Sequence, residues 1–293
     1  MEERLRQLSL SQTTVSLGVG TSTGTLYVFS KVIARELGRL GVGVQEVETR
    51  GPVDNLEKLE GRMVDLAGVP GAELHYRTPG LLQQNGVRLL FPLFRTQYQL
   101  VVRRDRDVSS WAEIKGRRIN VGQKGFSGLV VVRDILEQLG ITFEDFRPEY
   151  LTHDVACSQL RAGRLDGVIA PGAAPHPAIV RLSAEFPIDI LPLRNHELER
   201  VLSIPYLSET QVPPVYQGIS QPITTVGEWF ILACRQDLDD AIAQQLTERW
   251  WDMTDEMTQI HQAAASLPSP SRWNPPMPLH QGVESYYKHV RQE

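Results

Sequence analysis

Hydroxyl side chains are dense in one short Gly-containing segment near the N-terminus. Residues 20–25 read GTSTGT, which places hydroxyl groups on Thr21, Ser22, Thr23 and Thr25. A hydroxyl group both donates and accepts hydrogen bonds, so four of them together suit a small polar anion such as a carboxylate. The alternative is that Ser and Thr simply cap a following helix. One cap needs only one hydroxyl group, so we predict that this segment is a ligand-binding loop.

Three further segments carry polar or cationic side chains that are candidates for the same site. The second loop, in TRGPVDN, offers Thr49, Arg50 and Asn55. Arg50 and Lys124 would make the site locally cationic, although both also fit solvated surface charge. The remaining candidates follow two later strand-like runs and are Phe126, Ser127, Gly172 and His176.

A dinucleotide site is weakly indicated by Gly18-x-Gly20, with Glu48 as the residue that would bind a ribose. Thr23 stands where the fingerprint requires its third glycine, so close packing of a helix over a pyrophosphate is not supported. We therefore expect no dinucleotide cofactor, and no other cofactor is indicated.

Catalytic and metal-binding patterns are also weak. The segment GFSGL around Ser127 misses the nucleophile-elbow spacing by one residue. His153 and Asp154 lie at an expected helix start, where capping is the commoner role. No HExxH motif occurs, and Glu197 and Glu199 near His196 lack a recognised metal-ligand spacing. We expect neither an enzyme nor a metal site.

Composition excludes several classes of protein. The chain has 293 residues, with 30 Lys and Arg against 35 Asp and Glu and a formal net charge of −5. Without a basic excess, no nucleic-acid partner is expected. Hydrophobic residues at 41% and charged residues at 22% are typical of a globular protein. No apolar run approaches the ~20 residues that span a bilayer. Two cysteines, Cys157 and Cys234, are too few for a disulfide framework, and the sequence does not say whether they pair.

Strand-like and helix-like patterns alternate along the first part of the chain. Val15–Val19 has strand length, and the apolar residues from Leu26 to Leu40 recur at the helical period until Gly41. A second strand over Val42–Val47, a short helix and a third strand ending at Pro70 follow. The pattern predicts a β-α-β-α-β series.

The same series returns about one hundred residues later, with landmarks at nearly constant offsets. Such spacing favours a true repeat, although αβ units of similar size also resemble one another. The matched landmarks are Gly20 with Gly122, Gly41 with Gly140, Gly61-Arg62 with Gly163-Arg164, Asp65 with Asp166, and Pro70-Gly71-Ala72 with Pro171-Gly172-Ala173.

Two strand-like runs, around Gln97–Val102 and in TTVGEWFILACR, are expected to carry the chain between two similar α/β lobes. Lobe 1 would comprise residues 1–98 and 226–293, and lobe 2 residues 99–225. Residues 238–267 are expected to form one long helix. Two crossings make a hinge, with a ligand cleft where the loops of both lobes face one another.

Several segments, taken in order, resemble the TAXI-type solute-binding proteins of tripartite ATP-independent periplasmic (TRAP) transporters. They are LGVGTSTGTLYVFSKVIARELG, TRGPVDNLEKL, YQLVVRRDRDVSSWAEIKGRRINVG, LRAGRLDGVIAPGAAPHPAI and TTVGEWFILACR. The resemblance spans nearly the whole chain. It implies a type II periplasmic-binding-protein fold, capture of a small organic anion or amino acid, usually glutamate-like or glutamine-like, and delivery to the TRAP membrane subunits. The chain itself is expected to be a monomer.

Carried over by position, the family's first ligand loop falls on residues 21–25, and Tyr27 stands for one of its usual tyrosines. In its second loop Asn55 is kept, whereas Arg50 and Pro52 depart from the family pattern. Phe126 and Ser127 replace a typical Ser-Gly, and His176 takes a position often held by Asn. An added Arg can pair bidentately with a second carboxylate, so we expect a dicarboxylate or an acidic amino acid.

Such proteins act outside the cytoplasm, and periplasmic or extracytoplasmic placement is expected. Residues 1–14 lack the apolar core of a signal peptide, which suggests that a leader or membrane anchor has been removed. A cytoplasmic relative is the alternative. An enzyme or a ligand-sensing domain on the same bilobed fold also remains open.

Overall fold

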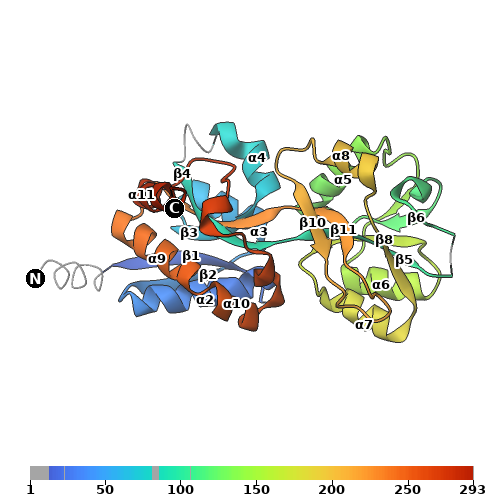
Figure 1. Ribbon diagram of the computed structural model, residues 1–293, viewed down its shortest axis with the longest axis horizontal. Coiled ribbons are helices and arrows are strands. Elements are labelled where there is room, and N and C mark those ends of the chain that lie inside the picture. The colour runs from blue at the N-terminus through green and yellow to red at the C-terminus, as the bar shows by residue number, and fades with distance from the viewer. Residues whose placement is uncertain (1–12, 23, 81–85, 106, 293) are drawn as a thin grey trace, which may run out of the picture. The chain divides into compact units, whose positions relative to one another are not determined.

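The computed structural model describes residues 13–22, 24–80, 86–105 and 107–292. The chain divides into two compact units. Unit 1 consists of Met1–Arg95 and Trp229–Glu293, and unit 2 of Thr96–Glu228. Each unit is a mixed α/β structure built on its own five-stranded sheet (Figure 1).

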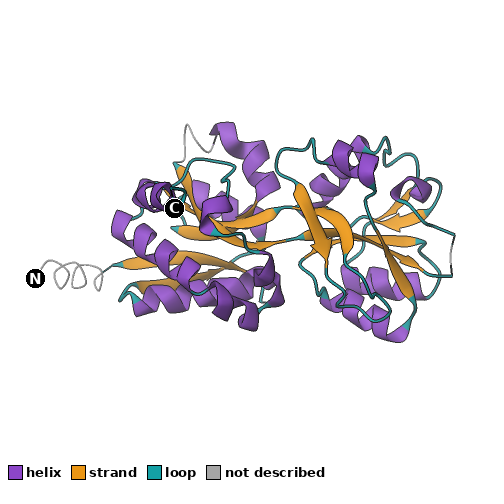
Figure 2. Ribbon diagram, viewed as in Figure 1, coloured by secondary structure: helices purple, strands orange, loops and turns teal. Residues whose placement is uncertain are grey.

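Unit 1 has the strand order β2-β1-β3-β12-β4, in which β12 is antiparallel to its neighbours and β1 is parallel to β2 and β3. Helices lie on both faces of this sheet (Figure 2). The strands are β1 (Thr14–Gly20), β2 (Gly43–Glu48), β3 (Leu66–Pro70), β4 (Val87–Arg95) and β12 (Trp229–Arg235). The helices are α2 (Thr25–Arg39), α3 (Pro52–Glu60), α4 (Gly71–Gly80), α9 (Asp240–Asp252), α10 (Thr254–Ile260) and α11 (Gln281–Val290), with the 3-10 turns η3 (Gln262–Ser266) and η4 (Pro270–Arg272).

Unit 2 has the strand order β7-β6-β8-β5-β9 and a separate antiparallel pair, β10 and β11. The strands are β5 (Gln97–Arg103), β6 (Arg118–Asn120), β7 (Arg147–Glu149), β8 (Gly167–Gly172), β9 (Ile188–Leu191), β10 (Ser208–Val212) and β11 (Ile223–Gly227). The helices are α5 (Gly128–Gln138), α6 (His153–Arg161), α7 (Pro177–Glu185) and α8 (Asn195–Val201), with the 3-10 turn η2 (Trp111–Ile114).

The two sheets share one plan, as the internal repeat predicts. Strands β7, β6 and β8 occupy the places that β2, β1 and β3 occupy in unit 1, and antiparallel β5 corresponds to β12. The matched aspartates make equivalent hydrogen bonds. Asp65 accepts a hydrogen bond from the backbone N–H of Ser16 at 2.7 Å, and Asp166 accepts one from that of Arg118 at 2.9 Å. Each carboxylate thus ties the start of one parallel strand to its neighbour.

One pair of landmarks is displaced by a residue. The helix-ending turn with positive φ falls on Arg62 (57°) in unit 1 but on Gly163 (70°) in unit 2. The equivalent backbone bonds run from Met63 N–H to Lys58 and from Arg164 N–H to Gln159. The structural counterpart of Gly163 is therefore Arg62, and the matching Gly-Arg letters do not align in space.

The expected long helix over residues 238–267 is wrong, because it is broken twice. Helix α9 ends at Asp252, and α10 ends before the extended residue His261. Trp250 stacks on Phe91 with ring centroids 4.7 Å apart, and the Trp251 indole N–H donates to the Tyr287 hydroxyl at 2.9 Å. Both tryptophans lie inside α9, and the helix is interrupted at Met253, whose φ is −103° and ψ 12°.

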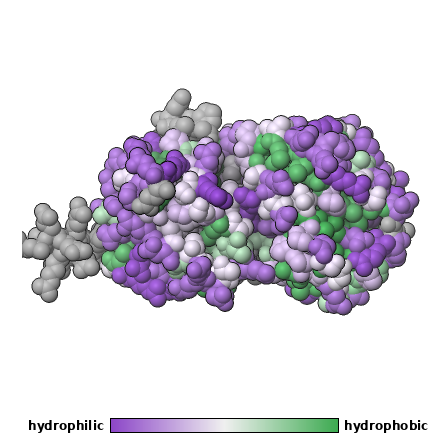
Figure 3. Space-filling model, viewed as in Figure 1, coloured by the Kyte–Doolittle hydropathy of each residue, from purple (hydrophilic) through white to green (hydrophobic). Residues whose placement is uncertain are grey.

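Apolar side chains make up the buried core of the described residues. Hydrophilic side chains predominate on the face shown in Figure 3, with smaller hydrophobic areas among them. Cys157 in unit 2 and Cys234 in unit 1 are free and buried. Burial raises the pKa of Cys157 to about 12 and also raises that of Cys234. Within the described ranges, no helix combines the length and the apolar character that crossing a bilayer requires.

Two glycines three residues apart at the end of α2 should respond oppositely to alanine. Gly38 is exposed inside the helix, and a Cβ atom there would meet open space, so Gly38→Ala should raise the free energy of unfolding by about 1 kcal/mol. Gly41 has φ 82° and follows the helix, so Gly41→Ala should lower it by about 1 kcal/mol. Urea unfolding of both variants checks this, and a shift of the same sign in both would contradict it.

Candidate functional site

The first predicted loop leaves the end of β1 and enters α2. Gly20 has φ 75°, and the N-cap of α2 is Gly24, so no hydroxyl group of Thr21, Ser22 or Thr25 caps this helix. Thr21 and Ser22 are exposed, and Thr25 is partly exposed. Thr23 lies outside the described residues. The hydroxyl groups of the described loop residues are thus not required for helix capping.

Tyr27, on the first turn of α2, is partly exposed. The Lys31 ammonium lies 4.9 Å from the centroid of its ring, in a cation–π arrangement. Lys31 also forms an ion pair with Glu46 on β2. One face of the Tyr27 ring is therefore occupied from within unit 1.

A buried hydrogen-bond network joins the carboxyl ends of three strands in unit 1. The Thr49 hydroxyl accepts from the Gly20 backbone N–H at 3.1 Å and donates to Asn55 Oδ1 at 2.6 Å. Asn55 Nδ2 donates to the Gly68 carbonyl at 2.8 Å. Thr49 is 4% exposed and Asn55 is fully buried. These two predicted site residues therefore hold the loops after β1 and β2 in place, and Asn55 presents no free polar group.

The Gly18-x-Gly20 pattern has a structural explanation in this network. A Cβ atom at Gly18 would lie 3.0 Å from Asn55 Oδ1, so a side chain there would displace the amide. Gly20 supplies the positive φ that turns the chain out of β1. Both glycines are accounted for without a nucleotide.

Arg50 follows Thr49 and stands largely in solvent, with 84% of its side chain exposed. Its guanidinium lies 3.3 Å from Asp54 and 4.0 Å from Glu57. The Arg50 backbone N–H also donates to Asp54 at 2.9 Å, which with the guanidinium holds the pKa of that carboxyl below its usual value. Arg50 is therefore an exposed cation of unit 1 with two carboxylates within ion-pair distance.

In unit 2 the loop between β6 and α5 carries three predicted residues. Gly122 and Gly125 turn this loop with φ values of 94° and 81°. Lys124 is exposed, with its ammonium 4.8 Å from the centroid of the Tyr150 ring. Phe126 is 40% exposed. Ser127 is the N-cap of α5 by position, yet its hydroxyl makes no capping hydrogen bond.

The loop between β8 and α7 carries Gly172 and His176. A Cβ atom at Gly172 would lie 2.7 Å from the His176 ring, so the absence of a side chain makes room for this imidazole. His176 Nδ1 accepts from the Ala178 backbone N–H at 3.3 Å. The His176 backbone N–H donates to the Tyr216 hydroxyl, which donates to Gln99, both at 2.8 Å. Burial lowers the pKa of His176 to about 3.

The structure connects these two loops through a residue that sequence reasoning assigned to helix capping. His153, on the first turn of α6, lies with its Nδ1 2.8 Å from His176 Nε2. Its ring also meets Phe126 edge-on, with centroids 6.3 Å apart. Thr152, and not His153, caps α6. The internal repeat could have indicated His153 as a site residue, because the loop after β7 is the counterpart of the Thr49–Arg50 loop after β2.

The described residues thus form two local groups. In unit 1, the Gly20–Thr49 hydrogen bond brings the loop with Thr21, Ser22 and Thr25 beside the loop with Arg50. In unit 2, Phe126 and His176 meet through His153, with Ser127 following Phe126 and Gly172 below the His176 ring. Lys124 belongs to the same loop as Phe126 but contacts Tyr150.

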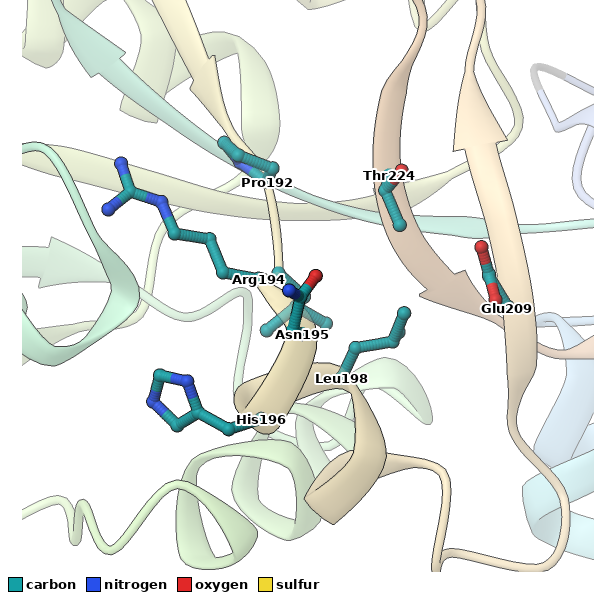
Figure 4. Close-up of a pocket in the computed structure, with 8 residues that line it drawn as sticks. Pro192, Arg194, Asn195, His196, Leu198, Glu209 and Thr224 are labelled. Atoms are coloured by element: carbon teal, nitrogen blue, oxygen red, sulfur yellow. The ribbon is translucent and has the colours of Figure 1, made fainter.

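Unit 2 also has a cavity of about 580 Å³ away from the predicted loops. In Figure 4, Asn195 and Leu198 of the α8 region lie on one side, and Glu209 and Thr224 on strands β10 and β11 lie on the other. The Arg194 backbone N–H donates to Glu197, and its guanidinium donates to the Ser109 carbonyl. None of the predicted ligand-binding residues lines this cavity. The hydrogen bonds of Arg194 are to residues of unit 2 itself. It is lined by Pro192, Leu193, Arg194, Asn195, His196, Leu198, Glu209 and Thr224.

The fold is the mixed α/β, two-sheet fold of type II periplasmic binding proteins, which confirms the expected fold class. The model of the NMT1-like family matches residues 17–290, and the chain belongs to this family.

Solved structures of transport binding proteins share the fold. The periplasmic aliphatic sulphonate binding protein SsuA of Escherichia coli is 15% identical, with a TM-score of 0.51 over 94% of this chain and 78% of that one. The probable amino-acid ABC transporter extracellular-binding protein ytmK of Bacillus subtilis is 12% identical, with a TM-score of 0.54 over 88% and 98%. A putative L-cystine ABC transporter of Listeria monocytogenes is 15% identical, with a TM-score of 0.51 over 87% and 98%.

Removal of the Thr49 hydroxyl should destabilise unit 1. Thr49→Val leaves the Gly20 N–H without its buried acceptor and Asn55 Oδ1 without its donor, so we expect a loss of about 2 kcal/mol in the free energy of unfolding. Thr49→Ser keeps the hydroxyl group and should lose less than half as much. Equal losses in the two variants, measured by denaturant unfolding, would show that the network does not hold these loops.

Acid should destabilise the protein through His176. Above about pH 6.5 this histidine is neutral in both the folded and the unfolded state, so its contribution to the free energy of unfolding is intact. As the pH falls from 6.5 toward 3, the unfolded chain takes up a proton that the folded chain excludes, and stability is lost. Between pH 7.5 and 5.5, wild type should lose about 1 kcal/mol more than His176→Asn. Parallel pH profiles in urea unfolding would contradict the assignment.

Proposed function

We propose that this protein is an extracytoplasmic solute-binding protein that captures a small organic oxyanion. The ligand is an amino acid with a free carboxylate or a dicarboxylate. The observation that carries the proposal is the repeated placement of polar loops at the carboxyl ends of parallel strands in both units. In such sheets, ligands bind beyond these strand ends, where helix N-termini favour negative charge.

The chemistry of the described loops supports an anionic ligand. Thr21 and Ser22 are exposed hydroxyl residues that do not cap α2, and Arg50 is an exposed cation beside them in unit 1. Lys124 is an exposed cation in unit 2. A guanidinium pairs bidentately with a carboxylate, which favours a ligand with a second carboxyl group. Solved structures of similar fold that are named for binding sulphonates or transporting cystine are consistent with this class of ligand.

We further propose that the membrane partner is a TRAP transporter, on the TAXI resemblance of the ligand-loop segments. The structural relatives are named for ABC transporters, and an ABC system is therefore the second candidate. Reconstituted uptake separates the two. A TRAP system should take up ligand under an imposed ion gradient without ATP, whereas dependence on ATP would favour an ABC system.

Two single variants, one in each unit, test the site. Calorimetry with L-glutamate, L-glutamine, succinate, L-cystine and ethanesulfonate should find a micromolar ligand, which corresponds to about 8 kcal/mol. Arg50→Ala and Lys124→Ala should each weaken its binding about 10-fold through loss of a charge-assisted hydrogen bond, or about 1.4 kcal/mol. Lys288→Ala, at an exposed lysine of α11, is the matched control and should change nothing.

The Arg50 variant also separates dicarboxylate from monocarboxylate ligands. Arg50→Ala should weaken succinate or glutamate more than a monocarboxylate of similar size, because the second carboxylate is assigned to Arg50. Unchanged affinity in both variants would exclude these loops as the binding site. Absence of binding by every compound would count against an organic oxyanion as the ligand.

A further inference from the structure

A buried pair of imidazoles in unit 2 has its hydrogen atoms fixed by its surroundings. The Ala178 backbone N–H donates to His176 Nδ1, so this nitrogen carries no hydrogen atom. The neutral ring then carries its hydrogen on Nε2, which lies 2.8 Å from His153 Nδ1. His153 Nδ1 must therefore accept, and its own hydrogen is on Nε2.

At the outer end of this hydrogen-bonded pair, the Nε2–H group of His153 has no acceptor among the described residues of unit 2. No described residue accepts a hydrogen bond from His153 Nε2, whereas the three other ring nitrogens of the pair are all engaged. The His153 ring is partly exposed and meets the exposed Phe126 edge-on, beside the loop that carries Lys124 and Ser127. A single N–H donor is thus presented at the loop edge of unit 2.

We propose that His153 is a ligand contact, and that its Nε2–H donates to an oxygen of a carboxylate or sulfonate group. His176 is a positioning residue that fixes the tautomer of His153, and the inference rests on the proposed function. The donor is a neutral dipole, so it selects an acceptor oxygen by hydrogen bonding, while Lys124 on the loop of Phe126 supplies charge. A ligand that presents an ammonium group at this point would be rejected.

The same geometry disfavours protonation of the neutral His153 ring to an imidazolium. Protonation of His153 would place hydrogens on both of its nitrogens and force His176 Nε2 to accept, which would move the His176 hydrogen onto Nδ1 against the Ala178 N–H. Burial also lowers the pKa of both histidines. The neighbouring charges, Asp154 and Arg181, are ion-paired with each other.

The other titratable neighbours of the pair stay neutral at physiological pH. Burial raises the pKa of Cys157 and of Tyr216 to about 12 in each case. Because burial lowers the pKa of His153, its ring should also be neutral at physiological pH.

Imidazole-labelled protein tests the fixed tautomers without any cognate ligand. In ¹H–¹⁵N spectra of the full chain with ¹⁵N-histidine, assigned with His153→Gln, both rings should be neutral with hydrogen on Nε2 at pH 7. In His176→Asn, the His153 signals should become a mixture of tautomers. A His153 ring that is cationic at pH 7, or protonated on Nδ1, would overturn the proposal.

Simple ions test the contact itself. Sodium acetate and sodium methanesulfonate should shift the His153 Nε2–H signal in a saturable way, and methylammonium chloride at equal ionic strength should not. No shift with either anion, or the same shift with all three salts, would overturn the contact.

Affinity measurements separate this inference from the function on which it rests. For the tightest compound of the calorimetric screen, His153→Leu should weaken binding about 10-fold. His153→Gln should recover most of it, because its amide can accept from His176 and still donate. His196→Gln, at an exposed histidine of α8, should have no effect. Unchanged affinity in His153→Leu overturns the contact alone, whereas a screen without any binder counts against the proposed function.

Discussion

The constraint on which the loops depend is that polar backbone groups at the buried ends of parallel strands must find partners. In unit 1 the Thr49 hydroxyl and the Asn55 amide satisfy groups from β1 and β3 at once. In unit 2 Asn120, fully buried at the end of β6, accepts from the Leu151 N–H at 2.8 Å. An unpaired buried group costs about 1–3 kcal/mol, so these side chains fix where each loop leaves its sheet.

The two units use the same strand order to present different chemistry. Unit 1 offers hydroxyl groups and the exposed guanidinium of Arg50, whereas unit 2 offers the ammonium of Lys124, the Phe126 ring and a neutral imidazole donor. An oxyanion group suits either set, since each presents hydrogen-bond donors or cations.

The strand and helix pattern could be predicted because apolar periodicity and helix-ending glycines such as Gly41 are local signals. The site could be predicted only in part. Asn55 was selected by its position, but its burial depends on the missing side chain of Gly18, 37 residues away, which no local pattern reveals. His153 read as a helix cap because its partner His176 lies on another loop. The break at Met253 was missed because no Gly or Pro marks it in the sequence.

A crystal structure with the tightest-binding compound of the screen would test the central claim most directly. The account predicts that an anionic group of the ligand lies at the loops of unit 2, with one oxygen within about 3.2 Å of His153 Nε2. A ligand seated only in the cavity between α8 and the β10–β11 pair, with these loops empty, would contradict it.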